Sequence, residues 1–426
     1  MVRFNDENEV IQEESYKAIL VGLQTDEDIS YYMEELNGLC QAAGIEVAGE
    51  MIQSKERPDT ATFIGKGKVD ELALMCTDME ADTVVFNNEL SGMQLRNLEE
   101  KLGVRVIDRT ILILDIFADR AVSREGKLQV ELAQLQYRLP RLTGFGKSLS
   151  RLGGGIGTRG PGEKKLETDR RHITKRMDEI KREIEEVKNN RRTQRAQREK
   201  SGIPLVALVG YTNSGKSALM NRFLYDTLKE DKAVTERDML FATLDTFQRH
   251  IKLDTNHEFI LIDTVGFVSN LPHSLIKAFK ATLEEVVYAD LLLHIVDASY
   301  EHNDFHIQVT NQVLNEIGAG NKDRIMVYNK IDRLGQADRT LYEGQNSLCI
   351  SAKYGENIYR LIHMIKSRLF GGRIRVSMLI PYDKGTIVSD LCNRYEILNT
   401  EYRSDGTYLE AELSTEDFQR FERYRI

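Results

Sequence analysis

The chain has 426 residues, 41% of them hydrophobic, so it is long enough for two to four domains with packed cores. It contains no apolar run of membrane-spanning length, which argues against stable membrane insertion, and its polar, acidic start does not resemble a secretory signal. The four cysteines are scattered without C-x-x-C spacing, so we expect reduced thiols and a cytoplasmic location rather than disulfides or a zinc site.

The charge of the chain is unevenly distributed. The formal net charge is −9, but residues 138–200 carry 19 Lys/Arg against 9 Asp/Glu. A local excess of positive charge in an acidic chain indicates that this segment meets a polyanion.

Residues 1–124 are expected to form an N-terminal α/β domain with a mostly parallel sheet, because short apolar runs alternate with helical patterns. The expected strands are 18–21, 45–47, 83–86 and 104–107, and the expected helices are 26–42 and 91–102. The segment Gly65-Lys-Gly-Lys68 favours a plain turn before a helix over a phosphate contact.

Residues 125–200 are predicted to form an antiparallel helical hairpin, because 125–142 and 163–200 each carry apolar residues spaced by three or four. The connecting loop, 144–162, contains eight glycines and no acidic residue. Its cations Lys147, Arg151 and Arg159 are candidate RNA contacts, because Lys and Arg bind phosphates and glycine permits close approach. A flexible linker is the alternative.

Residues 201–371 alternate strand and helix regularly and predict a Ras-like nucleotide-binding domain with a mixed, mostly parallel sheet. The expected buried strands are 205–209, 259–262, 291–296, 325–328 and 348–350. Residues 372–426 predict a small C-terminal α+β domain without a chemical motif, which we interpret as an interaction or packing module.

Residues 210–217, Gly-Tyr-Thr-Asn-Ser-Gly-Lys-Ser, match the G-x-x-x-x-G-K-[ST] phosphate loop between a strand and a helix. The two glycines let successive N–H groups surround a polyphosphate, and the helix dipole adds positive potential. Lys216 is expected to reach the β- and γ-phosphates, and the Ser217 hydroxyl to ligate Mg²⁺.

Two downstream segments predict the remainder of the phosphate and metal site. Asp263-Thr-Val-Gly266 ends a strand, so Asp263 is expected to hold Mg²⁺ through water while the Gly266 N–H senses the γ-phosphate. Thr243, within Phe241-Ala-Thr243, is the candidate for a mobile threonine that ligates Mg²⁺ directly.

Two further motifs predict guanine specificity. In Asn329-Lys-Ile-Asp332, the Asp332 carboxylate can accept from guanine N1–H and N2–H₂, and a buried carboxylate would be unpaired against adenine. Asn329 suits the O6/N7 side, and Lys330 packs on the base. In Ser351-Ala-Lys353, the Ala352 N–H is expected to meet guanine O6.

The expected GTP-binding residues are therefore Gly210, Tyr211, Thr212, Asn213, Ser214, Gly215, Lys216, Ser217, Phe241, Ala242, Thr243, Asp263, Thr264, Val265, Gly266, Asn329, Lys330, Asp332, Ser351, Ala352 and Lys353. The expected catalytic residues are Lys216, Thr243, Gly266 and Asn213.

Phe267 follows Gly266 where a water-orienting glutamine often lies, and phenylalanine cannot hydrogen-bond a water. Slow intrinsic hydrolysis, completed by an external surface, is the expected consequence. Asn213 is a candidate for holding K⁺ in place of an arginine finger; a local turn bond is an equal alternative.

Over essentially its whole length the chain resembles the HflX family of bacterial GTPases. The resemblance rests on 63–68, 153–155 with 159–163, 210–217, 241–245 and 263–267. It departs at Thr246, where the family usually has proline, which affects the first switch loop but not Mg²⁺ ligation by Thr243.

The resemblance implies a monomeric GTPase that binds the large ribosomal subunit and its rRNA. It also implies that the subunit stimulates hydrolysis of GTP to GDP, that the hairpin loop lies near the peptidyl-transferase centre, and that the protein dissociates or rescues stalled ribosomes. A ribosome-assembly GTPase and a regulatory switch acting on protein partners remain alternatives.

Overall fold

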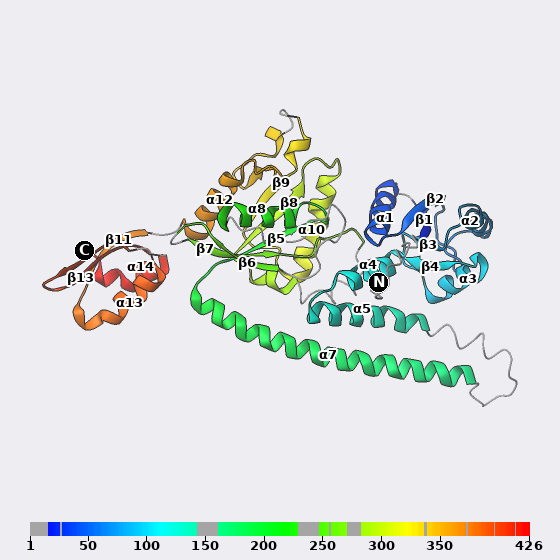
Figure 1. Cartoon of the computed structure of the whole chain (residues 1–426), viewed down its shortest axis with the longest axis horizontal. Helices are drawn as coiled ribbons and strands as arrows, with labels where there is room; N and C mark the ends of the chain where they lie inside the picture. Colours follow the sequence, from blue (N-terminus) through cyan, green and yellow to red (C-terminus); the bar gives the residue numbers. More distant parts are fainter. Residues whose placement is uncertain are drawn as a thin grey trace, which may run out of the picture. The chain divides into compact units, whose positions relative to one another are not determined.

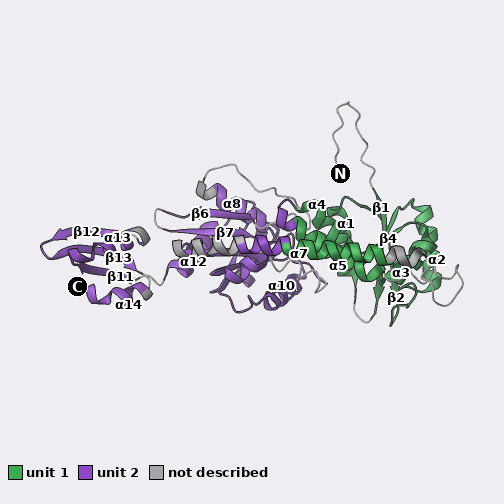
Figure 2. Cartoon of the chain, turned by 90° about the horizontal axis from the view of Figure 1, so that it is seen from below, with its two compact units in different colours: residues 1–121, 127–182 green, residues 122–126, 183–426 purple. Residues whose placement is uncertain are grey.

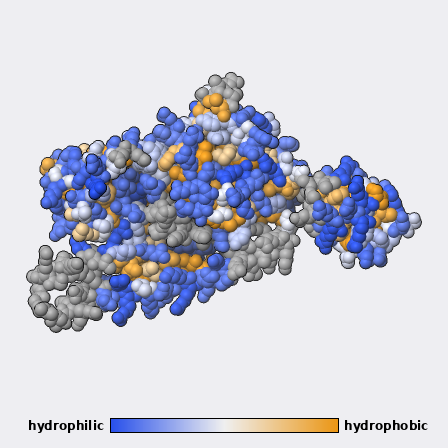
Figure 3. All heavy atoms as spheres, turned by 180° about the vertical axis from the view of Figure 1, so that it is seen from behind, coloured by the Kyte–Doolittle hydropathy of each residue, from blue (hydrophilic) through white to orange (hydrophobic). Residues whose placement is uncertain are grey.

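A computed structural model describes residues 16–25, 28–142, 161–228, 247–254, 257–270, 283–335, 339–371, 374–395, 397–413 and 415–426 (Figure 1). The chain divides into two compact units (Figure 2). Unit 1 comprises residues 1–121 and 127–182, and unit 2 comprises residues 122–126 and 183–426. Hydrophilic residues cover much of the face in Figure 3, and no helix in the described ranges is long and apolar enough to cross a membrane.

Unit 1 is built on a four-stranded parallel sheet of order β2-β1-β3-β4. Its strands are β1 (Lys17–Gln24), β2 (Glu46–Ser54), β3 (Thr83–Phe86) and β4 (Arg105–Asp108). Its helices are α1 (Ser30–Ala42), α2 (Lys66–Asp78), α3 (Gly92–Leu102) and α4 (Arg109–Arg120). Gly65 is the N-cap of helix α2, but Lys66, Gly67 and Lys68 already form the first turn of that helix, so only the first residue of this segment lies before it.

Helices α5 (Arg124–Leu142) and α7 (Pro161–Ser201) pair as an antiparallel hairpin (Figure 1). Arg176 of α7 makes two hydrogen bonds with Glu131 of α5, at 2.7 and 2.9 Å. Arg124 at the start of α5 meets Glu183, farther along α7, at 2.9 Å. Since the contacts run in opposite directions along the two helices, the pairing is antiparallel.

The nucleotide-binding part of unit 2 has a six-stranded sheet of order β10-β9-β8-β5-β7-β6. All neighbours in it are parallel except β6 and β7. The strands are β5 (Leu205–Gly210), β6 (Phe247–Lys252), β7 (Glu258–Asp263), β8 (Leu291–Asp297), β9 (Arg324–Asn329) and β10 (Ser347–Cys349). Separate buried clusters pack on the two faces, one including α8 (Lys216–Leu228) and α12 (Ile358–Phe370), the other including α10 (Asn303–Ile317).

The C-terminal part has a three-stranded antiparallel sheet of order β11-β13-β12. Its strands are β11 (Ile374–Ile380), β12 (Ile397–Arg403) and β13 (Gly406–Leu413), and its helices are α13 (Gly385–Arg394) and α14 (Thr415–Phe421). A small buried cluster joins strands and helices. The predicted fold class is therefore confirmed: a parallel-dominated α/β protein with an N-terminal α/β part and a small C-terminal α+β part.

Candidate functional site: a phosphate loop and its neighbouring strand ends

The phosphate-loop candidate joins the end of β5 to the start of α8. Strand β5 is fully buried, and its parallel neighbours β7 and β8 bring their carboxyl ends to the same edge of the sheet. Gly215 has φ +93°, and a Cβ there would collide with the Asn329 amide nitrogen. Glycine fits both this backbone conformation and the small space, and it therefore allows the loop to pass close to Asn329 at the end of β9.

Lys216 lies across the loop that it follows. Its ammonium donates to the carbonyl oxygens of Gly210 at 3.1 Å and Tyr211 at 2.7 Å. Burial lowers the pKa of Lys216 to about 8, with Asp263 opposing this shift and Lys330 adding to it. A polyphosphate beside this ammonium would restore its charged form, because an anion favours the cation.

Ser217 and Asp263 form the metal-site candidate. The Ser217 hydroxyl donates to Asp263 Oδ2 at 2.6 Å, and Asp263 is fully buried at the end of β7, level with Leu208 of β5. A hydroxyl and a carboxylate are oxygen donors of the kind that Mg²⁺ prefers, so the pair fits that ion. Bound there, Mg²⁺ would neutralise charge on the β- and γ-phosphates.

The segment after Asp263 lies directly against the phosphate loop. A Cβ on Gly266 would be 2.6 Å from Thr212 Cα and 3.0 Å from Lys216 Nζ, so glycine is needed for this approach. Phe267 is 2% exposed and belongs to the buried cluster that also contains Leu283 and Val286. Its side chain therefore packs in the core, and this position supplies no group that could orient water.

The placement of Asn329 differs from the prediction. Its amide nitrogen donates to the Ser214 carbonyl oxygen at 2.9 Å, and its amide oxygen accepts from the Ala352 N–H at 3.0 Å. The Asn329 amide and the Ala352 N–H, which were both expected to meet the O6/N7 edge of guanine, thus bond to each other. Asn329 is 2% exposed and joins the phosphate loop to the Ser351–Lys353 loop, a position in which its two polar atoms are satisfied.

Asp332 also differs from the prediction, because it is exposed rather than buried. One of its carboxylate oxygens accepts from the fully buried Ser351 hydroxyl at 2.6 Å, which fixes the orientation of the group. The desolvation that would penalise adenine must therefore arise when a bound base covers the carboxylate. The structure thus brings the side chains of Ser351 and Asp332 into direct contact.

Lys330 has a left-handed backbone (φ +64°), and its ammonium meets Asp297 Oδ2 at 2.7 Å. Sequence reasoning missed Asp297, although it ends β8 as Asp263 ends β7. Its other oxygen accepts from the N–H and hydroxyl of Ser299, at 3.0 and 2.6 Å. Lys353 is exposed, with its ammonium 5.1 Å from the centre of the Tyr354 ring.

The structure brings most of the predicted residues to one edge of the β5–β7–β8–β9 sheet. Thr264 donates to the Leu208 carbonyl at 2.6 Å, and Thr212 and Val265 are each 6% exposed. Asn213 is exposed with φ +56°, a turn conformation that asparagine tolerates. The predicted residues Phe241, Ala242, Thr243, Lys147, Arg151 and Arg159 lie outside the described residues.

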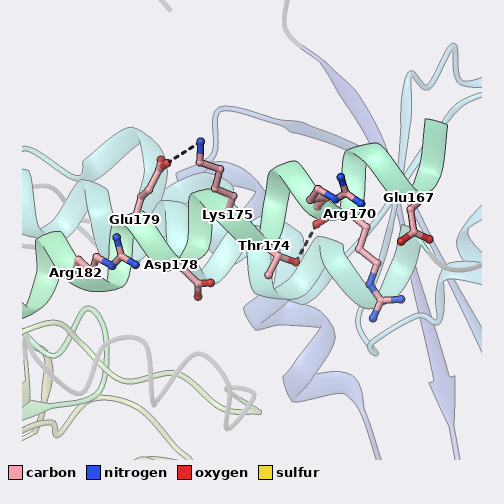
Figure 4. Close-up of a pocket in the computed structure, with 8 residues that line it drawn as sticks. Glu167, Arg170, Thr174, Lys175, Asp178, Glu179 and Arg182 are labelled. Atoms are coloured by element: carbon pink, nitrogen blue, oxygen red, sulfur yellow. Dashed lines mark hydrogen bonds and ion pairs between the residues drawn. The ribbon is translucent and has the colours of Figure 1, made fainter. Parts of the chain in front are cut away.

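A second surface feature is a shallow pocket along α7 (Figure 4). Cations and carboxylates both line it, and Lys175 pairs with Glu179 at 3.8 Å. The lining residues are Glu167, Arg170, Arg171, Thr174, Lys175, Asp178, Glu179 and Arg182. Because the charges offset one another, this part of α7 has the character of a solvated helix face.

Three family models match successive parts of the chain. The model described as "GTP-binding GTPase N-terminal" matches residues 30–118, "GTP-binding GTPase Middle Region" matches 120–198, and "50S ribosome-binding GTPase" matches 205–330. These matches cover most of unit 1 and the nucleotide-binding part of unit 2 as far as residue 330, so that β1, β10 and α12 lie outside them.

Curated relatives named GTPase HflX match nearly the full length. The protein of Caldanaerobacter subterraneus subsp. tengcongensis is 46% identical over 420 residues, which cover 98% of this chain and 96% of the relative. That of Lacrimispora saccharolytica is 43% identical over 412 residues, 96% of each. A solved GTP-binding protein from Sulfolobus solfataricus, in complex with GDP, is 25% identical with a TM-score of 0.45, covering 83% of this chain and 98% of that one.

Proposed function

Because the chain belongs to the HflX family and is a GTP-binding GTPase, we propose that it binds the large ribosomal subunit and dissociates or rescues stalled ribosomes. In this proposal the subunit stimulates hydrolysis of GTP to GDP, and the GTP-bound form holds the ribosome. Support comes from the matched model for a 50S ribosome-binding GTPase and from the basic excess in residues 138–200.

The observation that carries the proposal is the position of Phe267. Its side chain is committed to the core beside Leu283, so the position next to Gly266 lacks a group to align a water with the γ-phosphate. Such a site binds GTP but hydrolyses it slowly, since positioning of the nucleophile is a large part of phosphoryl-transfer catalysis. A surface that completes the site on contact would couple hydrolysis to that contact.

In this mechanism Lys216 and the loop N–H groups hold the β- and γ-phosphates, and Gly266 donates its N–H to the γ-phosphate. Ser217, Asp263 and the proposed Thr243 would hold Mg²⁺, which supplies charge neutralisation when bound. Asp332, oriented by Ser351, accepts the donors of guanine. Asn213 is proposed either to hold K⁺ or to shape the loop.

The proposed ribosome contacts are the loop cations Lys147, Arg151 and Arg159. Co-sedimentation with large subunits in a non-hydrolysable GTP analogue tests them. We expect the protein to pellet, and Arg151→Glu with Arg159→Glu to weaken pelleting at least about 10-fold through lost phosphate contacts and added repulsion. A matched control is Arg170→Glu with Arg171→Glu, which reverses two charges in the mixed-charge pocket of α7.

The same assay separates the alternatives. A switch that acts on protein partners would stay in the supernatant and ignore both charge reversals. A ribosome-assembly factor would pellet with immature subunits in preference to mature ones. Stimulation of GTP turnover by mature large subunits supports the dissociation or rescue role, and turnover that is fast alone and indifferent to ribosomes refutes it.

A further inference from the structure

Among the described residues, hydrogen bonds from Phe267 and Ser269 tie the γ-phosphate-sensing segment to the phosphate loop. Two are backbone bonds: Phe267 N–H donates to the Gly210 carbonyl at 3.2 Å, and Thr212 N–H donates to the Phe267 carbonyl at 2.7 Å. The third uses a side chain: the Ser269 N–H donates to the Tyr211 hydroxyl oxygen at 2.6 Å. Tyr211 is 4% exposed and Ser269 is 1% exposed, so this bond is shielded from water.

The Tyr211 ring is held by an aromatic stack. The His306 ring of α10 lies 3.7 Å from it with an interplanar angle of 10°, and the Tyr300 ring lies 4.9 Å from His306 at 2°. Two rings on the same face of one imidazole at these distances would overlap, so His306 lies between the tyrosines. The stack therefore connects the loop before α10 and the first turns of α10 to the phosphate loop.

We propose that Tyr211, His306 and Tyr300 are positioning residues for the γ-phosphate-sensing segment. The stack fixes the Tyr211 ring, the Tyr211 hydroxyl fixes Ser269, and Ser269 with Phe267 holds Gly266 against the phosphate loop. Because Gly266 approaches Thr212 and Lys216 so closely, its N–H can be presented to a γ-phosphate only while this arrangement holds.

The proposed positioning of Gly266 should affect the affinity for GTP but not the affinity for GDP. A bond that positions Gly266 affects a nucleotide only through the γ-phosphate, so its loss should weaken GTP binding and leave GDP binding nearly unchanged. A role limited to folding would weaken both equally. The GTP-to-GDP affinity ratio is thus the readout that a merely structural contribution would not move.

The first test uses Tyr211→Phe in the full-length protein. This variant keeps the stacking ring and removes the hydroxyl. We expect affinity for a non-hydrolysable GTP analogue to fall about 3- to 10-fold relative to GDP, the usual effect of one buried hydrogen bond. Basal single-turnover hydrolysis should fall in the same direction. The matched control, Tyr359→Phe, removes the hydroxyl of a 73% exposed tyrosine on α12 and should change neither value.

The second test asks whether the stack acts through Tyr211. His306→Ala should lower the GTP-to-GDP affinity ratio, and His306→Phe, which retains a flat stacking ring, should restore it. In a double-mutant cycle, Tyr211→Phe with His306→Ala should be no worse than Tyr211→Phe alone. Additive effects would overturn the proposed route from the stack to Ser269.

Equal losses of GTP and GDP affinity in Tyr211→Phe, or no loss of either, would overturn the positioning role itself. The inference rests on the proposed contact between the Gly266 N–H and the γ-phosphate of GTP, and not on a ribosomal partner. All measurements are made without ribosomes, so failure of the co-sedimentation experiment leaves this inference standing, and failure here leaves the ribosomal proposal standing.

Discussion

Asn329 and Asp332, two polar residues of the nucleotide site, differ in burial and in the groups that they contact. Asn329 is buried, and its amide joins the phosphate loop to the Ser351–Lys353 loop. Asp332 is exposed, and Ser351 fixes its carboxylate. We therefore propose that discrimination among bases depends on Asp332, while Asn329 joins the two loops.

Asp332→Asn should change the preferred base. The carboxylate offers two acceptors to the N1–H and N2–H₂ donors of guanine, whereas an amide offers one acceptor and one donor. Xanthine has a carbonyl in place of the amino group and so matches the amide. We expect GTP affinity to fall about 100-fold and XTP affinity to exceed it, because a mismatched polar group is left unpaired under the base. Competition binding measures both, and unchanged GTP affinity would contradict the assignment.

Lys216 should take up a proton when nucleotide binds. Burial lowers its pKa to about 8 in the free protein, and the phosphates raise that pKa because they favour the charged form. The free lysine is therefore partly neutral above pH 8 and must be protonated on binding. We expect an uptake of roughly 0.8 proton at pH 8.5 and roughly 0.1 at pH 7.0, from the titration curve of a single group.

Calorimetry in buffers of different ionisation enthalpy measures this uptake, and pH 7.0 is the internal control. Affinity should also fall with increasing steepness above pH 8. An equal heat in all buffers at pH 8.5 would show that the lysine is already fully charged in the free protein.

At the scale of elements, one buried carboxylate attaches α5 to the N-terminal sheet. Asp108 at the end of β4 is fully buried and accepts from the Tyr137 hydroxyl of α5, from Leu90 N–H at 3.0 Å and from Ile111 N–H at 3.0 Å. Arg141 of α5 donates to the Leu90 carbonyl at 2.8 Å and covers the Tyr137 ring. The first hairpin helix is thus held by charge-assisted bonds, which are stronger than neutral ones.

Tyr137→Phe should loosen this attachment. It removes one donor to a buried carboxylate and keeps the ring under Arg141, so we expect a loss of about 1–3 kcal/mol in the free energy of unfolding. Hydrogen exchange should increase in α5 more than in α8, which lies in the other unit. Tyr354→Phe, at a 64% exposed tyrosine, is the control. Unchanged exchange in α5 would contradict the assigned role of the Asp108 cluster.

Sequence periodicity predicted most elements because they bury one clear face or, like β5, are wholly apolar. Strand β6 was missed because its apolar positions, Phe247 and Ile251, are separated by three polar residues on an edge strand. Helix α4 was missed because its apolar run directly follows β4, and the signal for its start, the Asp108 cap, is a side-chain bond to Ile111.

For the site, motifs predicted which strand ends meet but not how their polar atoms pair. The Asn329 amide could have faced the base or the neighbouring loops, and only the close approach of Gly215 decides this. The Tyr211–His306–Tyr300 stack joins residues 95 positions apart, and ring geometry leaves no local pattern in a sequence. The predicted domain boundaries stay predictions, although α5 from residue 127 onward and the first half of α7 belong to the same compact unit as the N-terminal sheet.

At the scale of the whole molecule, the central sheet of unit 2 contains a group that makes folding sensitive to acid. His294 of β8 is 1% exposed, and its Nδ1 has no hydrogen-bond partner within the described ranges. Burial, with Arg324 and Lys216 nearby, lowers the pKa of His294 from 6.5 to about 3. The folded chain therefore keeps this imidazole neutral, while the unfolded chain protonates it below pH 6.5.

This difference in protonation makes the stability of unit 2 depend on pH. Between pH 6.5 and about 3 the unfolded state binds one more proton, so the stability of unit 2 should fall with decreasing pH by up to about 1.4 kcal/mol per pH unit from this group. His294→Leu, which is similar in size and cannot be protonated, should flatten that dependence and raise the free energy of unfolding at pH 5. His363→Leu, at an exposed histidine of α12, should leave the slope unchanged. Denaturant unfolding of both variants at pH 7.5 and 5 measures the slopes, and equal slopes in His294→Leu and the unmodified chain would show that β8 tolerates a charged imidazole.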